Sequence, residues 1–188
     1  MSLVGISNFH YSLLTKDDES GAAYGNMKKI AGLISVNINP ASASETLYAD
    51  NGPFETATTL GEIEVSINVA DLSLQQQADL LGHKIENGMM VGKASDDAPY
   101  VGCAFESLKA NGKIRYVKLL KGKFAEPQEQ TNTKGDKIEF QTPTITGKFV
   151  CRACDKAWKK VADEDGEGFT AGIAEKWYES MEAASASE

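Results

Sequence analysis

Glu62-Ile63-Glu64-Val65-Ser66-Ile67-Asn68-Val69 alternates polar and apolar residues without interruption. Such alternation is typical of a half-buried strand, because successive side chains on a strand point to opposite faces of the sheet. We expect the apolar face to pack on a core and the polar face to meet solvent or a partner. The residues of the polar face are Glu62, Glu64, Ser66 and Asn68. The stretch predicts an antiparallel, mainly β protein.

A second strand is predicted over residues 29–39, as a neighbour of the first. Pro40 should end it, because proline has no N–H to donate to an adjacent strand. The apolar residues expected on one side of this strand are Ile30, Ile34, Val36 and Ile38.

Two Asn-Gly pairs predict β-hairpins, since both residue types tolerate the positive φ angles of a type I′ turn. Asn111-Gly112 carries the stronger signal and would join strands over residues 100–108 and 114–120. Asn87-Gly88 would join shorter arms, or form only a loop.

A last strand, or pair of strands, is expected over residues 138–150, and Pro143 should bend it or introduce a bulge. Ile138 and Phe140 would share a face before the bend. The face expected after it carries Ile145, Gly147 and Phe149.

One helix is well signalled over residues 74–81. Ser73 is a good N-cap, Gln76 completes a capping box, and Gly82 suits a left-handed C-terminal cap. A second possible helix, over residues 174–183, carries Trp177 and Met181 one turn apart.

Three long segments show no regular pattern, at residues 1–27, 40–60 and 123–135. Irregular connections of this length usually carry function or contact another molecule. In the second segment, Leu47, Tyr48 and Phe54 need apolar surroundings, which a partner subunit would provide. We therefore expect these three residues at an inter-subunit contact.

The chain has 188 residues, of which 41% are hydrophobic and 24% charged, so one domain with an ordinary core is expected. Its apolar runs are too short to span a bilayer. The first residues lack the basic flank and apolar stretch of a secretion signal. We expect a protein that folds in a reducing cytosol and does not contact a membrane.

The formal net charge is -8, which disfavours a general nucleic-acid binder. The charge is uneven, with a net -8 over residues 1–100, +4 over 101–150 and -4 over 151–188. Regions of opposite sign favour association between subunits.

The basic part of the chain is the predicted hairpin around Tyr116. Its cations are Lys109, Lys113, Arg115, Lys118, Lys121 and Lys123. By period 2, one face of the second arm would carry Lys113, Arg115, Lys121 and Lys123. This face could bind phosphate, so a β-sandwich binding module for nucleic acid or carbohydrate is the alternative function. We favour a charge-complementary contact between subunits at these four residues.

Residues with catalytic or metal-binding potential are few. Cys151 and Cys154 have the spacing of a redox or zinc motif, but the chain has only Cys103, His10 and His83 to complete a zinc site. We interpret Cys151 and Cys154 as unpaired thiols and both histidines as structural or surface residues. A redox or hydrolytic enzyme that uses the cysteines is the least favoured alternative.

Residues 163–167, Asp-Glu-Asp-Gly-Glu, lack the register of an EF-hand calcium loop and are expected to form a solvated acidic loop. We expect no catalytic, cofactor or metal site, and a protein that is not an enzyme.

A set of short motifs, in this order, resembles the major tail protein of long-tailed phages with non-contractile tails. The resemblance covers residues 4–150 and rests on the combination of motifs. They are Val4-Gly5-Ile6-Ser7-Asn8-Phe9, Tyr24-Gly25, Leu47-Tyr48-Ala49-Asp50-Asn51, Gly61-Glu62-Ile63-Glu64, the stretch from Asp71-Leu72 to Leu81-Gly82, Asn111-Gly112-Lys113, Lys121-Gly122-Lys123-Phe124 and Phe140-Gln141-Thr142-Pro143-Thr144-Ile145.

The resemblance implies a tail-tube β-sandwich or barrel over residues 1–150, flanked by one helix. Residues 1–27 would be an N-terminal arm, 40–60 a long inter-subunit loop and 151–188 a C-terminal extension or arm. Six copies would close into a ring, and the rings would stack into a tube around a tape-measure protein.

The implied location is the phage tail, assembled in the host cytoplasm together with terminator and initiator proteins. The tube would conduct DNA without binding it and would need no cofactor. We place the polar face that begins at Glu62 on the lumen, because an acidic surface repels phosphate and lets DNA slide.

Overall fold

The computed structural model describes residues 2–127, 133 and 140–182, and within them the protein is mainly β with one main helix. The helices are α1 (Leu74–Leu81) and α2 (Ala171–Lys176). The strands are β1 (Leu3–Asp18), β2 (Gly21–Tyr24), β3 (Lys28–Lys29), β4 (Leu33–Ala49), β5 (Gly52–Val69), β6 (Lys84–Glu86), β7 (Met89–Val91), β8 (Val101–Lys109), β9 (Ile114–Phe124), β10 (Thr144–Phe149) and β11 (Lys159–Asp163).

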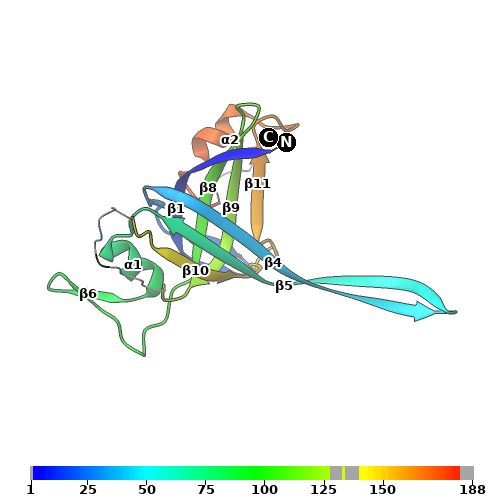
Figure 1. Cartoon of the computed structure of the whole chain (residues 1–188), viewed down its shortest axis with the longest axis horizontal. Coiled ribbons are helices and arrows are strands. Elements are labelled where there is room, and N and C mark those ends of the chain that lie inside the picture. The colour runs from blue at the N-terminus through cyan, green and yellow to red at the C-terminus, as the bar shows by residue number, and fades with distance from the viewer. Residues whose placement is uncertain (1, 128–132, 134–139, 183–188) are drawn as a thin grey trace.

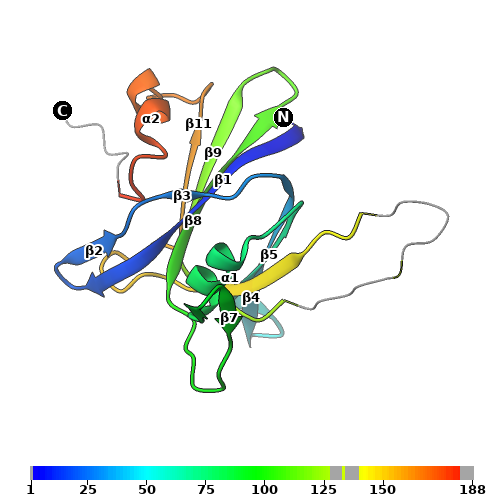
Figure 2. The same ribbon diagram turned by 90° about the vertical axis from the view of Figure 1, so that its left-hand side faces the viewer.

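One large antiparallel sheet has the strand order β2-β1-β8-β9-β10-β5-β4, with β3 added to β1 and β11 added to β9. The short strands β6 and β7 form a separate hairpin. The sheet bends so that β1, β8 and β9 lie across the core from β10, β5 and β4 (Figures 1 and 2). The expected antiparallel, mainly β fold with one helix beside it is therefore confirmed.

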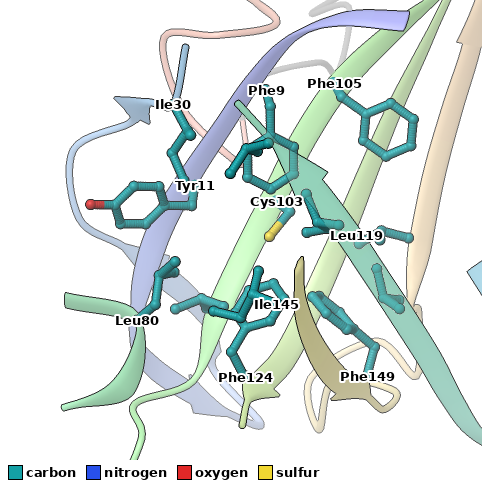
Figure 3. Close-up of a cluster of buried hydrophobic side chains, with 14 of the residues drawn as sticks. Phe9, Tyr11, Ile30, Leu80, Cys103, Phe105, Leu119, Phe124, Ile145 and Phe149 are labelled. Carbon is teal, nitrogen blue, oxygen red and sulfur yellow. The ribbon is translucent and has the colours of Figure 1, made fainter. Parts of the chain in front are cut away.

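The main core lies between these two walls and contains the aromatic pair Phe124 and Phe149, whose rings meet edge to face at 5.8 Å (Figure 3). Gly122 makes this packing possible, because a Cβ there would lie 2.5 Å from the ring of Phe149. Helix α1 adds Leu80 and Leu81 to the core. The hydroxyl of Tyr11 on β1 donates to Asp79 of the helix at 2.8 Å.

The strand predicted from the alternating stretch is the second half of β5. Its four apolar residues are all buried, and β4 pairs with it as expected. However, β4 continues through Pro40, so the predicted end is wrong. Proline is tolerated there because β4 is an edge strand of the sheet. Ile34 is half exposed rather than internal, because the register shifts between Leu33 and Ser35.

Both predicted hairpins form, but only one of them has the predicted type I′ turn. Asn87 and Gly88 both have positive φ angles, as in a type I′ turn, and join β6 to β7. In the Asn111-Gly112 hairpin only Gly112 has a positive φ angle. The carbonyl of Lys109 accepts a hydrogen bond from the N–H of Gly112, and the N–H of Lys109 donates to the carbonyl of Lys113. These contacts are typical of a three-residue loop, in which a type I turn precedes a left-handed residue.

Helix α1 has the predicted bounds, including the Ser73 and Gln76 capping box and the left-handed Gly82. The second helix is displaced toward the N-terminus. It ends at Lys176, and Trp177 and Met181 are buried after it.

Strand β10 begins directly after Pro143, and its buried face carries the predicted residues Ile145, Gly147 and Phe149. Ile138 lies outside the described residues, and Phe140 is exposed outside any strand. Of the segment 123–135, residues 123–124 belong to β9 and much of the remainder lies outside the described residues.

The prediction that residues 1–27 are irregular is wrong. β1 pairs with β8 over residues 3–13 and with β2 over residues 14–18, and its Phe9 and Tyr11 are among the most buried side chains. Register shifts between Leu3 and Gly5 and between Ser7 and His10 interrupt the alternation, and this explains why the sequence pattern does not reveal the strand.

Candidate assembly surfaces

The most prominent surface feature is the ribbon formed by β4 and β5. Beyond Pro40 the two strands leave the body of the protein and pair only with each other (Figure 1). The prediction of an irregular loop at residues 40–60 is therefore wrong. Asp50 and Asn51 both have positive φ angles and form a two-residue turn between Ala49 and Gly52. The Asp50-Asn51 pair is the local signal for this turn, whereas the sequence does not show the length or exposure of its arms.

The tip of this ribbon carries the three apolar residues expected at a contact. Leu47 is 59% exposed, Tyr48 71% and Phe54 72%. Leu47 pairs with Glu55 and Tyr48 with Pro53, so Phe54 is an extra residue in a β-bulge. Bulges redirect side chains, and this one places a third apolar group at the tip. No surface of the body covers these side chains within the described residues.

The polar face of β5 lies beside β10. Asn68 donates to Thr144, and the hydroxyls of Ser66 and Thr146 are hydrogen-bonded at 3.0 Å. Lys148 of β10 forms an ion pair with Glu62 at 2.6 Å and is the cross-strand partner of Glu64. The four predicted residues do share one outward face, but Lys148 offsets part of its negative charge.

The basic hairpin is neutralised within the chain at its turn. Arg115 donates two hydrogen bonds to Asp163 of β11, at 2.6 and 2.7 Å. Lys109 pairs with Asp163 and Asp165, and Lys113 pairs with Glu164. Asp163 has a strongly lowered pKa, because its hydrogen bond with Arg115 outweighs the opposing effect of desolvation. The prediction of a solvated acidic loop at residues 163–167 is confirmed only in part: residues 165–167 are exposed, but Asp163 belongs to β11, and three carboxylates of the segment bind the hairpin.

The predicted common face of Lys113, Arg115, Lys121 and Lys123 does not exist. Val101 pairs with Gly122 but Cys103 pairs with Leu119, so β9 contains one extra residue between them. This bulge inverts the alternation. Lys121 and Lys123 lie instead over the ring of Tyr100, each 4.8 Å from its centroid.

Lys121 and Lys123 are also paired with acids. Lys123 contacts Asp97, and Lys121 lies 2.6 Å from the buried carboxylate of Asp17. Burial raises the pKa of Asp17, but hydrogen bonds from Lys121 and from the backbone of Ala153 and Cys154 outweigh it and lower the pKa to about 2. Asp17 thus ties the residues after β10 to the end of β1.

A second core lies on the outer face of β8 and β9, under the residues after Gly168. It contains Ala104, Tyr116, Leu120, Trp177 and Met181. Two cations are buried there. The Lys118 ammonium lies over Trp177 and donates to the carbonyl of Ser180, while Arg152 binds Asp155 and Glu182. Sequence reasoning missed both, because Arg152 lies inside the apparent cysteine motif and Lys118 inside the basic hairpin.

The three cysteines are unpaired, and His83 lies between two carboxylates. Cys103, Cys151 and Cys154 are free thiols, and burial raises the pKa of Cys103. His83 is bonded to Asp96 at 2.9 Å and to Glu126, and these hydrogen bonds raise its pKa. Among the residues that the structure describes, no group of His, Cys, Asp and Glu could hold a metal ion.

His10 lies beside the ring of Tyr178, at 4.4 Å between centroids, and is hydrogen-bonded to the carbonyl of Asn8. Desolvation by burial lowers its pKa. Both histidines therefore have structural contacts, as interpreted from the sequence.

Comparison with known proteins adds no relative: the chain matches no protein-family model and no curated protein. Within the described part of the chain, no helix has the length and hydrophobicity needed to cross a membrane.

Proposed function

We propose that this protein is a self-assembling structural subunit, the major tail protein that builds the tube of a long-tailed phage. The observation that carries the proposal is the β4–β5 ribbon, which holds Leu47, Tyr48 and Phe54 in solvent, away from the body. Exposing three large apolar side chains at one tip is unfavourable for a lone monomer, and such patches mark contacts with other molecules. A second copy of the chain provides that contact in a tube.

The edges of the sheet support ring formation. β4 is a terminal strand, and its outer backbone edge has no partner strand within the described residues. Long unprotected edges promote pairing with further chains, and closure of a ring removes them. Six copies would close such a ring in the proposed tube, and stacked rings would enclose the tape-measure protein and later the DNA.

The outward face of β5 is the proposed lumen lining. Glu62, Glu64, Ser66 and Asn68 lie together there, and Lys148 is the cation beside them. We expect the double reversal Glu62→Lys and Glu64→Lys to slow DNA ejection and to make its rate depend on salt, because the lumen would then attract phosphate. The reversal Glu86→Lys on β6 serves as the control. Ejection kinetics unchanged by the double reversal would contradict the lumen assignment.

The alternative function, binding of nucleic acid or carbohydrate by the basic hairpin, receives less support. Lys109, Lys113 and Arg115 are engaged by Asp163, Glu164 and Asp165, so little free positive charge remains at the turn. Binding of the isolated protein to DNA with a strong salt dependence would favour this alternative.

The proposal is tested by negative-stain electron microscopy of the purified protein at high concentration, with the solution mass measured on the same sample. We expect sixfold rings or hollow tubes. Failure to form either would contradict the proposal, and discrete oligomers of another symmetry would limit it to self-association.

Deletion of residues 42–56 separates folding from assembly. The body keeps its core, because the deleted residues are almost all exposed and pair only within the ribbon. We expect a folded monomer with a near-normal unfolding transition and no tubes by microscopy. Normal tubes from the shortened chain would contradict the role of the ribbon.

A further inference from the structure

A groove opens between the two walls of the sheet at the end where β1 and β4 begin. It has a volume of about 680 Å³, within the range of roughly 300–1,000 Å³ that is usual for ligand sites. Three large apolar side chains on its rim are half exposed: Leu3, Ile34 and Val161. Phe105 and Val117 line it more deeply. The groove therefore offers apolar surface that the chain itself leaves uncovered.

The groove has one positive charge that no described carboxylate neutralises, that of Lys159. Arg115 and Lys159 are its charged lining residues, and no carboxylate of the described part of the chain lines it. Arg115 shares its charge with Asp163, but within the described residues no carboxylate pairs with Lys159, whose ammonium lies over the ring of Trp158. An occupant with apolar side chains and negative charge would complement this surface.

The tip of the β4–β5 ribbon has that chemistry. Residues 42–60 contain three acids and no Lys or Arg. The acids are Glu45, Asp50 and Glu55. They surround the exposed Leu47, Tyr48 and Phe54, the largest uncovered apolar group of the ribbon. Groove and tip are therefore complementary both in hydrophobicity and in charge.

The tip cannot occupy the groove of its own chain. Ile38 of β4 lines the groove, and Tyr48 lies ten residues further along the same extended strand. At a rise of about 3.3 Å per residue the tip is roughly 30 Å beyond the groove. The ribbon is seen in Figure 1 to run away from the body without folding back. The occupant that fits is the tip of another molecule.

We propose that the groove is the receptor for the ribbon tip of a second copy of this chain. The inference deepens the proposed function, because it identifies the surface that receives the ribbon in the assembly. Each copy carries one tip and one groove, which are different surfaces, so the contact is heterologous. Heterologous contacts propagate head to tail and build rings or filaments rather than closed dimers.

Two variants with complementary defects test this arrangement. The tip variant carries Tyr48→Ala and Phe54→Ala, and the groove variant carries Ile34→Glu and Val161→Glu. All four side chains are about half exposed or more, so both variants should fold. The control is Met89→Glu on β7, an exposed apolar residue outside groove and tip. Circular dichroism and thermal unfolding would check each fold.

Analytical ultracentrifugation then measures association. We expect the dissociation constant for self-association to rise at least about tenfold in each variant alone. The control should associate as the wild type does. A mixture of the two variants should form a discrete 1:1 dimer, because one intact tip meets one intact groove and the chain of contacts then stops. A mixture that stays monomeric, a groove variant that associates normally, or a wild type that stays monomeric at its highest soluble concentration would overturn the inference.

The two proposals fail in different ways. Tubes formed equally by the wild type and the groove variant would overturn the groove assignment and leave the tube function intact. Dimers in the variant mixture without rings or tubes from the wild type would support the tip and groove contact and contradict the tube function.

Discussion

The β8–β9 wall and the β4–β5 ribbon are both antiparallel hairpins, yet their environments are opposite. The wall is covered on one face by the main core and on the other by the C-terminal segment, so Cys103, Ala104, Leu119 and Leu120 are all fully buried. The ribbon beyond Pro40 is exposed on both faces. Burial of apolar area drives folding, so the wall stabilises the monomer and the ribbon contributes little. The ribbon is available for contacts between molecules.

The same substitution, placed once in the main core that covers the wall and once at the ribbon tip, gives the largest expected difference. Phe149→Ala should lower the free energy of unfolding by about 3–5 kcal/mol, because a fully buried ring is lost and a cavity remains beside Phe124. Phe54→Ala should change it by less than about 0.5 kcal/mol. Urea denaturation of both variants measures the difference. A cost above about 1 kcal/mol for Phe54→Ala would show that the tip packs within its own chain.

The second prediction compares the stability lost when a buried ion pair and an exposed ion pair are broken. Arg152→Ala should lower the free energy of unfolding by about 2–3 kcal/mol, because it removes a guanidinium only 2% exposed and leaves Asp155 and Glu182 without it. Lys148→Ala, which breaks the exposed pair with Glu62, should cost less than about 0.5 kcal/mol. Equal costs in denaturant titrations would contradict the structural role assigned to Arg152.

The smallest expected effect depends on pH. The folded pKa of Asp17 is about 2, below its usual value, so its pair with Lys121 stabilises the protein above about pH 4 and this contribution is lost as the pH falls toward 2. Asp17→Asn should cost on the order of 1–2 kcal/mol at pH 7 and almost nothing near pH 2. Asp97→Asn, at the exposed pair with Lys123, is the matched control. Stability curves measured from pH 2 to 7 should show Asp17→Asn below the wild type at pH 7 and converging with it near pH 2, whereas Asp97→Asn should follow the wild type throughout. A cost of Asp17→Asn that does not change with pH would contradict the role of this carboxylate.

Local sequence patterns correctly predicted the elements that are regular and whose apolar face is buried. The alternation from Ile63 to Val69 gave the buried face of β5, and Ser73 and Gly82 gave both ends of α1. Elsewhere the alternation predicted the wrong face, because a β-bulge adds a residue to the strand. One extra residue in β9 separates Lys121 and Lys123 from Arg115, and nothing in the local sequence marks it. The ribbon was hidden because its arms are exposed on both faces and therefore show no alternation.

The electrostatic contacts of the candidate surfaces depended on residues distant in the chain. The basic hairpin looked like an open cationic surface, and Asp163 and Asp165, about fifty residues later, neutralise it. A sequence shows the number of charges but not which of them meet, because pairing depends on strand order. Here β11 is placed next to β9, with Asp163 directly opposite Arg115.

The sequence by itself determined a mainly β chain, one capped helix, unpaired cysteines and an acidic surplus, since each follows from local spacing or composition. Tertiary structure alone decided that residues 42–56 are an exposed ribbon, that the hairpin cations are paired, and that a groove lies too far from its own tip to receive it. Those features depend on how strands separated by many residues pack together. Packing selects among the faces and partners that local patterns leave equally possible.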